Sequence, residues 1–202
     1  MPYDAGMNSI RPAIEELERI YVAFTPLFKR PMPLPVITIQ SKGRKSALGW
    51  HWRDKWQNAE PGKLAEINLC AEYLGRSVEE IAETILHEMA HHANSLDGIS
   101  DCTIRQYHNQ HFKHRCEELG LICEKHPSRG WATTSLSDAL KVKVAAMNIN
   151  ADAFTLFRTS PNAKKPETKM KKWRCSCTTV RAAVQVDAIC KKCGLEFILQ
   201  NH

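Results

Sequence analysis

The chain has 202 residues, of which 43% are hydrophobic and 25% charged, so it can bury a core and is not a disordered polyelectrolyte. No apolar run approaches the length that crosses a bilayer, and the N-terminus lacks the basic flank and apolar block of a secretory signal. We therefore expect a cytoplasmic protein without a membrane partner, whose eight cysteines are thiols or metal ligands rather than disulfides.

The net charge of +6 is concentrated at the end of the chain. Residues 1–160 carry 19 Lys or Arg and 19 Asp or Glu, whereas the remaining residues carry nine bases and three acids. A localised basic segment indicates a polyanionic partner. A solubilising tail is the alternative.

The first region has the pattern of a helix followed by short strands. Apolar residues between Ile10 and Phe24 fall on one helical face, and the prolines from Pro26 onward exclude its continuation. The link KGRK at residues 42–45 predicts a turn. Three stretches have the composition or alternation of strands, namely 36–40 (VITIQ), 47–56 (ALGWHWRDKW) and 66–70 (EINLC). We expect them to form a small antiparallel or mixed sheet.

The clearest helix in the sequence follows Ser77. Ser77 and Glu80 form a capping box, the next apolar residues recur every 3.6 positions, and Gly98 lies beyond the end. Another helix is predicted between Asn109, as N-cap, and Gly120, as C-terminal stop.

Residues 121–172 have a less decisive pattern. Residues 136–154 are compatible with a helix, and residues 159–172 form a polar, lysine-rich linker.

The helix after Ser77 carries the motif H-E-x-x-H at His87, Glu88 and His91. Residues four apart lie one turn above each other, so both imidazoles can face a single ion. Glu88 then stands beside that ion, where a general base can take a proton from water. The motif also occurs by chance, but here it lies on a strongly predicted helix preceded by sheet-like segments. A zinc site is therefore predicted.

A catalytic zinc has three protein ligands and one open position, so a third ligand must come from downstream. The segment YHNQHFKHRC supplies His108, His111 and His114. The residues alone do not separate these candidates, although His108 falls just before the predicted helix cap, where its side chain can turn back. His111 and His114 fit exposed helical positions, and His92 points to another face of the metal helix.

These segments resemble the SprT-like family of zinc metallopeptidases, which includes the Spartan proteases of DNA–protein crosslink repair. The resemblance is carried by ETILHEMAHHAN and YHNQHFKHRCEELGL, and it extends back through AEINLCAEYL and forward into the C-terminal cysteines. It implies a third ligand four residues before a phenylalanine, which is His108 before Phe112. Asn109 and Gln110 follow where many members have glycine and a small residue. This is nearer the bacterial and phage-type pattern and weakens any transfer of substrate from Spartan.

Further residues near the motif are candidates for the substrate cleft. Tyr107 is either an oxyanion-stabilising group or a packing residue. His51 and Arg53 share one face of their strand, which either lines the cleft or is solvated. Substrates of zincins pair with a sheet edge, and residues 66–70 are our prediction for that edge.

Four C-terminal cysteines predict a structural zinc site. Cys175 and Cys177 are separated from Cys190 and Cys193 by twelve residues, and four thiolates in two close pairs suit tetrahedral zinc, although the first pair is C-x-C. Gly194 allows the tight turn of a zinc knuckle, and residues 178–187 between the pairs read as strand. A unit of this size needs the metal for its folding energy.

The ribbon is also the predicted nucleic-acid contact. Its candidate phosphate-binding residues are Lys171, Lys172, Arg174, Arg181, Lys191 and Lys192. Trp173 is either a stacking surface for a base or a packing residue of the ribbon. Among the other thiols, Cys70 is expected in the core. A further metal site at Cys116, Cys123 and His126 is the weaker alternative.

The sequence thus predicts an α+β chain with a zincin-like SprT-like domain at 1–125, whose small sheet packs on the H-E-x-x-H helix. A connecting segment and basic linker (126–172) and a β zinc ribbon (173–202) follow. The predicted activity is a zinc endopeptidase, with one catalytic and one structural zinc, acting near the nucleoid on DNA-associated or DNA-crosslinked proteins. One alternative is a catalytically silent nucleic-acid-binding adaptor, against which Glu88 argues. Another is a peptidase for one protein that docks on the ribbon.

Overall fold

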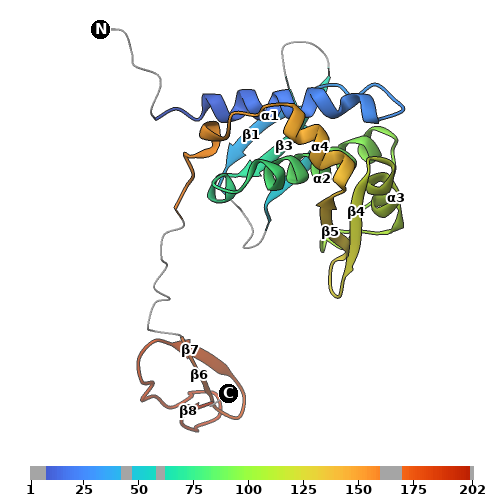
Figure 1. Ribbon diagram of the computed structural model, residues 1–202. Coiled ribbons are helices and arrows are strands. Elements are labelled where there is room, and N and C mark those ends of the chain that lie inside the picture. Colours follow the sequence, from blue (N-terminus) through green and yellow to red (C-terminus); the bar gives the residue numbers. More distant parts are fainter. Residues whose placement is uncertain (1–7, 42–46, 58–61, 160–169, 201–202) are drawn as a thin grey trace. The chain divides into compact units, whose positions relative to one another are not determined.

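The structure is a computed structural model that describes residues 8–41, 47–57, 62–159 and 170–200. The chain divides into two compact units, residues 1–159 and 160–202, which are described separately (Figure 1). The turn predicted at 42–45 and most of the lysine-rich linker lie outside the described residues. In the part of the chain that is described, no helix combines the length and apolar character needed to cross a membrane.

The larger unit is mixed α+β, as predicted. Its described helices are α1 (Arg11–Phe24), α2 (Val78–Leu96), α3 (Gln110–Glu118) and α4 (Asp138–Ala146), with 3-10 turns η1 (Thr25–Leu27), η2 (Ala71–Tyr73) and η3 (Ala151–Phe154). Its described strands are β1 (Val36–Gln40), β2 (Gly49–Gln57), β3 (Lys63–Cys70), β4 (Leu121–His126) and β5 (Gly130–Leu136).

The three-stranded sheet has the order β1-β3-β2, with β1 parallel and β2 antiparallel to β3. The prediction that residues 66–70 form the substrate-facing edge is therefore wrong, because these residues lie in the central strand and pair on both sides. Residues Glu66 to Cys70 are all buried, which fits a strand enclosed on both faces. The two edge strands are β1 and β2, and β2 is the edge strand that packs against α2.

The core of the larger unit lies between this sheet and the helices. Ile37, Ile67 and Leu69 of the sheet belong to one buried cluster with the apolar faces of α1 and α2. Helix α2 begins at the predicted capping box: the Ser77 hydroxyl accepts from the Glu80 amide, and the Glu80 carboxylate accepts from the Ser77 amide. This capping box fixes the first residue of α2, the helix that carries the H-E-x-x-H motif.

Residues beyond 125 contribute to the same unit. Strands β4 and β5 form an antiparallel hairpin that lies beside α3, and α4 follows it (Figure 1). Leu136, Leu140, Val144 and Phe154 are buried in the main core. The boundary that the sequence suggested at residue 125 falls within this hairpin, and the compact unit extends to Thr159. Only part of the region 136–154 is α-helical, because the segment after α4 turns into η3.

The smaller unit is a three-stranded β structure with the order β7-β6-β8. Its strands are β6 (Lys171–Arg174), β7 (Thr179–Ala182) and β8 (Ile198–Leu199), so the strand expected at 178–187 is shorter than predicted. Trp173 is only 7% exposed. It is therefore a packing residue of this unit, and the alternative that it stacks on a nucleic-acid base is wrong.

Two substitutions of the same kind in α4 test whether this helix stabilises the larger unit. Val144 is 2% exposed and Val142 is 70% exposed. We expect Val144→Ala to lower the free energy of unfolding by about 2 kcal/mol, because it removes two buried methyl groups and leaves a cavity. Val142→Ala should change it by less than about 0.5 kcal/mol. Denaturant titration followed by circular dichroism measures both, and equal effects would contradict the packing of α4.

Candidate metal centre

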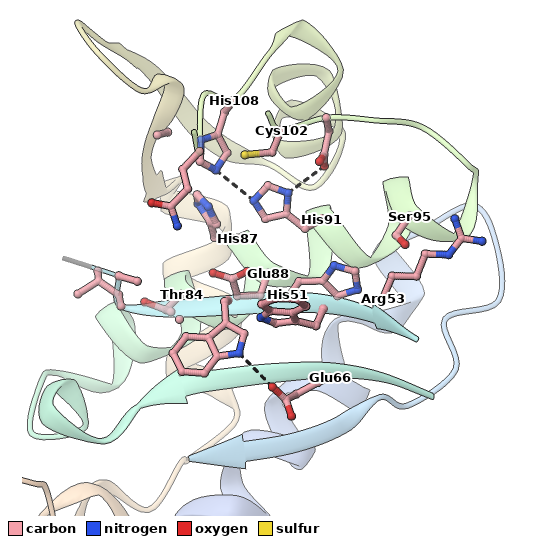
Figure 2. Close-up of a pocket in the computed structure, with 18 of the residues that line it drawn as sticks. His51, Arg53, Glu66, Thr84, His87, Glu88, His91, Ser95, Cys102 and His108 are labelled. Carbon is pink, nitrogen blue, oxygen red and sulfur yellow. Dashed lines mark hydrogen bonds and ion pairs between the residues drawn. The ribbon is translucent and has the colours of Figure 1, made fainter. Parts of the chain in front are cut away.

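Three histidines from two segments of the larger unit converge at one point. His87 and His91 extend from adjacent turns of α2, and His108 lies just before α3 (Figure 2). One ligand nitrogen from each ring lies within 4.8 Å of the others. The Nε2 atoms of His91 and His108 are 3.1 Å apart, near the roughly 3.3 Å expected for two nitrogens on a tetrahedral ion with bonds of about 2.0–2.1 Å. His111 and His114 are exposed on α3 and do not join this group.

The other nitrogen of each ring is already engaged, which orients the free nitrogen toward the common point. The Nδ1 contacts are His87 to the Thr134 hydroxyl at 3.2 Å, His91 to the Asp101 carboxylate at 2.9 Å, and His108 to the Arg129 carbonyl at 3.3 Å. Such partners fix the tautomer and direction of a metal-binding imidazole. The donor set therefore fits a zinc ion.

Asp101 and Thr134 are themselves held in place. Asp101 accepts a hydrogen bond from the Asn94 amide at 2.9 Å, and Arg115 donates to Asn94 at 3.0 Å. The Thr134 hydroxyl donates to Glu83 at 2.5 Å, so its oxygen can accept from His87. Asp101 therefore orients His91 from the loop before α3, and Thr134 orients His87 from strand β5.

Electrostatics favour neutral rings at two of the three histidines. Burial, with the neighbouring imidazoles, lowers the pKa of His87 well below its ordinary value and that of His108 to about 4. Burial also opposes a charge on His91, but the hydrogen bond to Asp101 raises its pKa. Burial alone would raise the pKa of Asp101, and its hydrogen bond to His91 lowers it. Neutral imidazoles carry the lone pair that a metal needs.

Phe112 packs against all three rings. Its ring centroid lies 4.6 Å from His87, 4.4 Å from His91 and 4.6 Å from His108, and its side chain is fully buried. One aromatic ring at the start of α3 thus forms the floor of the centre.

The backbone of His108 is clamped by the β4–β5 hairpin. Its amide donates to the Arg129 carbonyl at 2.9 Å, and its carbonyl accepts from the Trp131 amide at 3.0 Å. Gly130 lies between these contacts with φ +66°, and a Cβ there would be 2.1 Å from the His108 carbonyl oxygen. Only glycine permits this approach.

Glu88 lies between the histidines and the edge strand β2. Its side chain is 5% exposed, and burial raises its pKa to about 7. The backbone amide of His51 donates to its carboxylate, and a Cβ at Gly49 would lie 3.3 Å from its Oε1 atom. The close approach of β2 therefore holds Glu88 beside the three rings (Figure 2).

A cleft of about 960 Å³ opens over this group. It is lined by parts of β2, α2, the loop at 98–104 and the hairpin, and His51 and Arg53 are among its walls. His51 also contacts His92, with 3.2 Å between ring nitrogens, and His92 reaches the Pro33 carbonyl at 3.3 Å. His92 is thus a buried residue on a different face of α2 from the three converging histidines. Tyr107 packs against Gly130 and is not among the lining residues.

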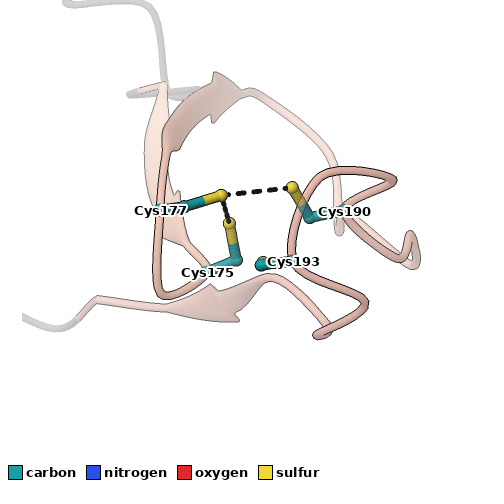
Figure 3. A group of neighbouring side chains, drawn as sticks. All are labelled: Cys175, Cys177, Cys190 and Cys193. Atoms are coloured by element: carbon teal, nitrogen blue, oxygen red, sulfur yellow. Dashed lines mark hydrogen bonds between the residues drawn. The ribbon is translucent and has the colours of Figure 1, made fainter.

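The four cysteines of the smaller unit form a second group. Their sulfur atoms lie within 4.8 Å of one another, with 3.7 Å between Cys175 and Cys177 and 3.6 Å between Cys177 and Cys190 (Figure 3). Tetrahedral zinc with bonds of about 2.3 Å separates its sulfurs by roughly 3.8 Å. Backbone amides of Cys193 and Lys192 lower the pKa of the Cys190 thiol. This cluster also fits zinc.

The remaining predictions have mixed outcomes. Cys70 is fully buried, as expected. Among the described residues, the three histidines and the four cysteines are the two groups whose ligand atoms lie close enough together to hold a metal ion. Cys116, Cys123 and His126 therefore do not form a third metal site. The six predicted phosphate-binding residues lie on the smaller unit, where Lys172 is half-buried opposite Arg181 and the other five are exposed.

The choice among the downstream histidines can be tested by zinc content. We expect the purified chain to hold two zinc ions and His108→Ala to hold one, because the two remaining imidazoles leave two coordination positions without a protein ligand and bind zinc far more weakly. His111→Ala is the matched control, since this residue is exposed on the same segment. Elemental analysis after dialysis measures the ratio. Two zinc ions in His108→Ala would contradict the assignment.

The clamp on His108 can be tested with two glycines. Gly130 and Gly98 both have positive φ, but a Cβ at Gly98 meets no atom within 4 Å. Gly98→Ala should lose about 1 kcal/mol of stability through backbone strain alone, and Gly130→Ala should lose more, because its Cβ also meets the His108 carbonyl oxygen. Only Gly130→Ala should also weaken zinc binding at the histidine centre, by about 10- to 100-fold, the usual effect of disturbing a ligand's support. Chelator competition measures this affinity, and equal zinc affinities would refute the clamp.

No curated protein and no solved structure matches the chain. The sequence model of the SprT-like family matches residues 17–129, which include α2, His108 and Phe112. The hairpin residues Gly130 and Thr134 lie just beyond the matched region. The match covers more than half of the chain, and the protein therefore belongs to the SprT-like family.

Proposed function

We propose that the protein is a zinc-dependent endopeptidase with a minimal zincin-like fold. The observation that carries this proposal is the position of Glu88, a buried carboxylate beside three converging imidazoles at the base of an open cleft. A site that only binds metal has no use for this carboxylate. The packing of the small sheet on α2 supports the zincin-like description.

The chemistry follows from the residues that surround the centre. When bound there, zinc supplies a Lewis acid that polarises the scissile carbonyl and activates water. Glu88 accepts the proton of the attacking water and returns it to the leaving amine. The His51 amide keeps the carboxylate turned toward the reacting atoms. His87, His91 and His108 act as a rigid donor set through Thr134, Asp101 and the Arg129 carbonyl.

An extended substrate would add to the sheet along β2. The Cys70 amide donates to the Leu48 carbonyl at 2.9 Å, which makes these residues a hydrogen-bonded pair of the antiparallel ladder. Because such pairs alternate, the peptide groups of Gly49 and His51 point away from β3 and toward the cleft side. The His51 amide is bonded to Glu88, so a peptide strand could pair with the other backbone groups of Gly49 and His51 that point away from β3.

DNA-associated or DNA-crosslinked proteins are the proposed substrates. Support comes from the basic C-terminal residues, where the sequence concentrates its whole positive excess, and from the exposure of Lys171, Arg174 and Lys191 on the smaller unit. Phosphate contacts of this kind would hold the enzyme on DNA without sequence preference.

Substitution of the general base tests the proposal. Glu88→Gln should retain both zinc ions and lower kcat/KM for an unfolded protein substrate by at least about 100-fold, the usual scale of general-base catalysis. The control is Glu79→Gln, an exposed glutamate of the same helix, which should match the wild-type protein. Cleavage is followed by gel and mass spectrometry, with and without single-stranded DNA.

The same experiment separates the enzyme from the adaptor alternative. If the wild-type protein cleaves nothing, with or without DNA, while it binds DNA as well as Glu88→Gln does, the chain is a binding module and the proposal fails.

A further inference from the structure

A tight turn precedes the third histidine of the metal centre. Its base is the antiparallel bridge between Cys102 and His108. Within it, the Gln106 amide donates to the Thr103 carbonyl at 2.8 Å, which closes a four-residue turn. We call residues 103–106 the rim turn, because three of them line the cleft.

Further hydrogen bonds make the rim turn rigid. The Thr103 amide donates to the Tyr107 carbonyl at 3.0 Å, and the Tyr107 amide donates to the Thr103 hydroxyl at 3.2 Å. Below the bridge, the Asn109 amide donates to the Asp101 carbonyl at 2.9 Å. The Asp101 carboxylate also holds His91, so both ends of the turn are anchored at the metal centre.

The residues of the rim turn are unusual for its backbone shape. Gln106 has φ +61°, a left-handed conformation that glycine and asparagine adopt more readily. Ile104 lies within the same turn, where small polar residues are the usual choice. Two departures from local sequence rules in one turn are typical of functional segments, because strain is retained where the conformation serves a purpose.

Ile104 is open to solvent at this turn. It is 92% exposed, the highest value among the large apolar side chains of the described residues. Its apolar side chain therefore contributes almost nothing to the core. A single exposed apolar residue is ordinary on a protein surface, but this one lines the cleft and lies on a rigid turn. Its position favours contact with a molecule bound in the cleft.

The rim turn and β2 lie on opposite sides of the metal centre. Figure 2 shows Cys102 and His108, from which the turn extends, on one side of Glu88, and β2 with His51 on the other. Ile104 is two residues beyond Cys102, about 7 Å of extended backbone. A peptide strand paired with β2 would therefore pass Ile104 close to its scissile bond.

The lining of the cleft suits a polypeptide better than a polyanion. Four acidic and three basic side chains line it, so the lining offers no net positive charge to a nucleic acid. Leu48 beside β2 and Ile99 and Ile104 before α3 add apolar side chains on both walls. An extended polypeptide fits such a cleft, because its backbone pairs with a sheet edge while alternate side chains contact the walls.

We propose that Ile104 is a specificity-determining residue, which packs against an apolar side chain of an extended polypeptide held along β2. The inference rests on the peptidase function proposed above and adds a substrate preference, namely a side chain of the size of leucine near the scissile bond. Both side chains lose water contact when the polypeptide binds, so their contact contributes affinity through burial of apolar surface.

Peptide binding to the zinc-loaded full chain carrying Glu88→Gln tests this preference without hydrolysis. Two labelled peptides of glycine, serine and alanine differ at one central position, which holds leucine or serine. Fluorescence anisotropy should show the leucine peptide bound about tenfold more tightly, the lower end of what burial of a leucine side chain gives. Ile104→Ala should reduce this preference to about twofold or less, whereas Ile104→Leu should keep it.

The matched control is Ile122→Ala, because Ile122 is 50% exposed on β4 and does not line the cleft. It should leave the leucine preference unchanged. Circular dichroism and zinc content should be the same in all variants, since truncation of an exposed side chain has little effect on stability. An equal leucine preference with and without Ile104→Ala overturns the proposal, as does equal binding of the two peptides or binding of neither.

Cleavage with Glu88 restored separates this inference from the peptidase proposal. If neither peptide is cleaved but the leucine preference still depends on Ile104, the peptidase proposal fails and the apolar contact stands. If the leucine peptide is cleaved with the same preference in Ile104→Ala, the contact fails and the peptidase proposal stands. Loss of a dimer in Ile104→Ala, without loss of the leucine preference, would overturn the contact and assign this residue to a second copy of the chain.

Discussion

The convergence of three imidazoles on one point is the constraint on which the rest of the larger unit depends. Two of the rings come from one helix, but the third comes from a loop, and its position is not set by local structure. Phe112 supports all three rings, and Asp101, Thr134 and the Arg129 carbonyl each hold one of them. Because these supports come from α3, the preceding loop and the hairpin, those elements must pack together before the donor set exists.

Much of the site was predictable because its signals are local. The capping box and the 3.6-residue spacing identify α2, and spacing alone places His87, Glu88 and His91 on it. The choice of His108 needed the family resemblance, since residue types could not separate it from His111. The hairpin's part could not be predicted, because Gly130 and Thr134 act through tertiary contacts with no local sequence pattern.

The errors have a physical cause of the same kind. Alternation identifies β3 as a strand, but it does not tell whether one edge or both edges are paired, so it cannot distinguish the central strand from an outer one. Trp173 likewise reads as a possible stacking ring until its burial is seen. On β2, alternation predicts a strand but does not tell which face is covered, and Trp52 and Trp56 are exposed. The edge strand β2 thus turns its backbone toward Glu88 of α2 and carries its tryptophans on the face away from the core.

The most direct measurement is a crystal structure of the zinc-loaded chain with anomalous data at the zinc edge. The account predicts a peak among the Nε2 atoms of rings 87, 91 and 108, with one coordination position free of protein atoms and open to carboxylate 88. A peak elsewhere in the larger unit, or a fourth protein ligand filling that position, would contradict it.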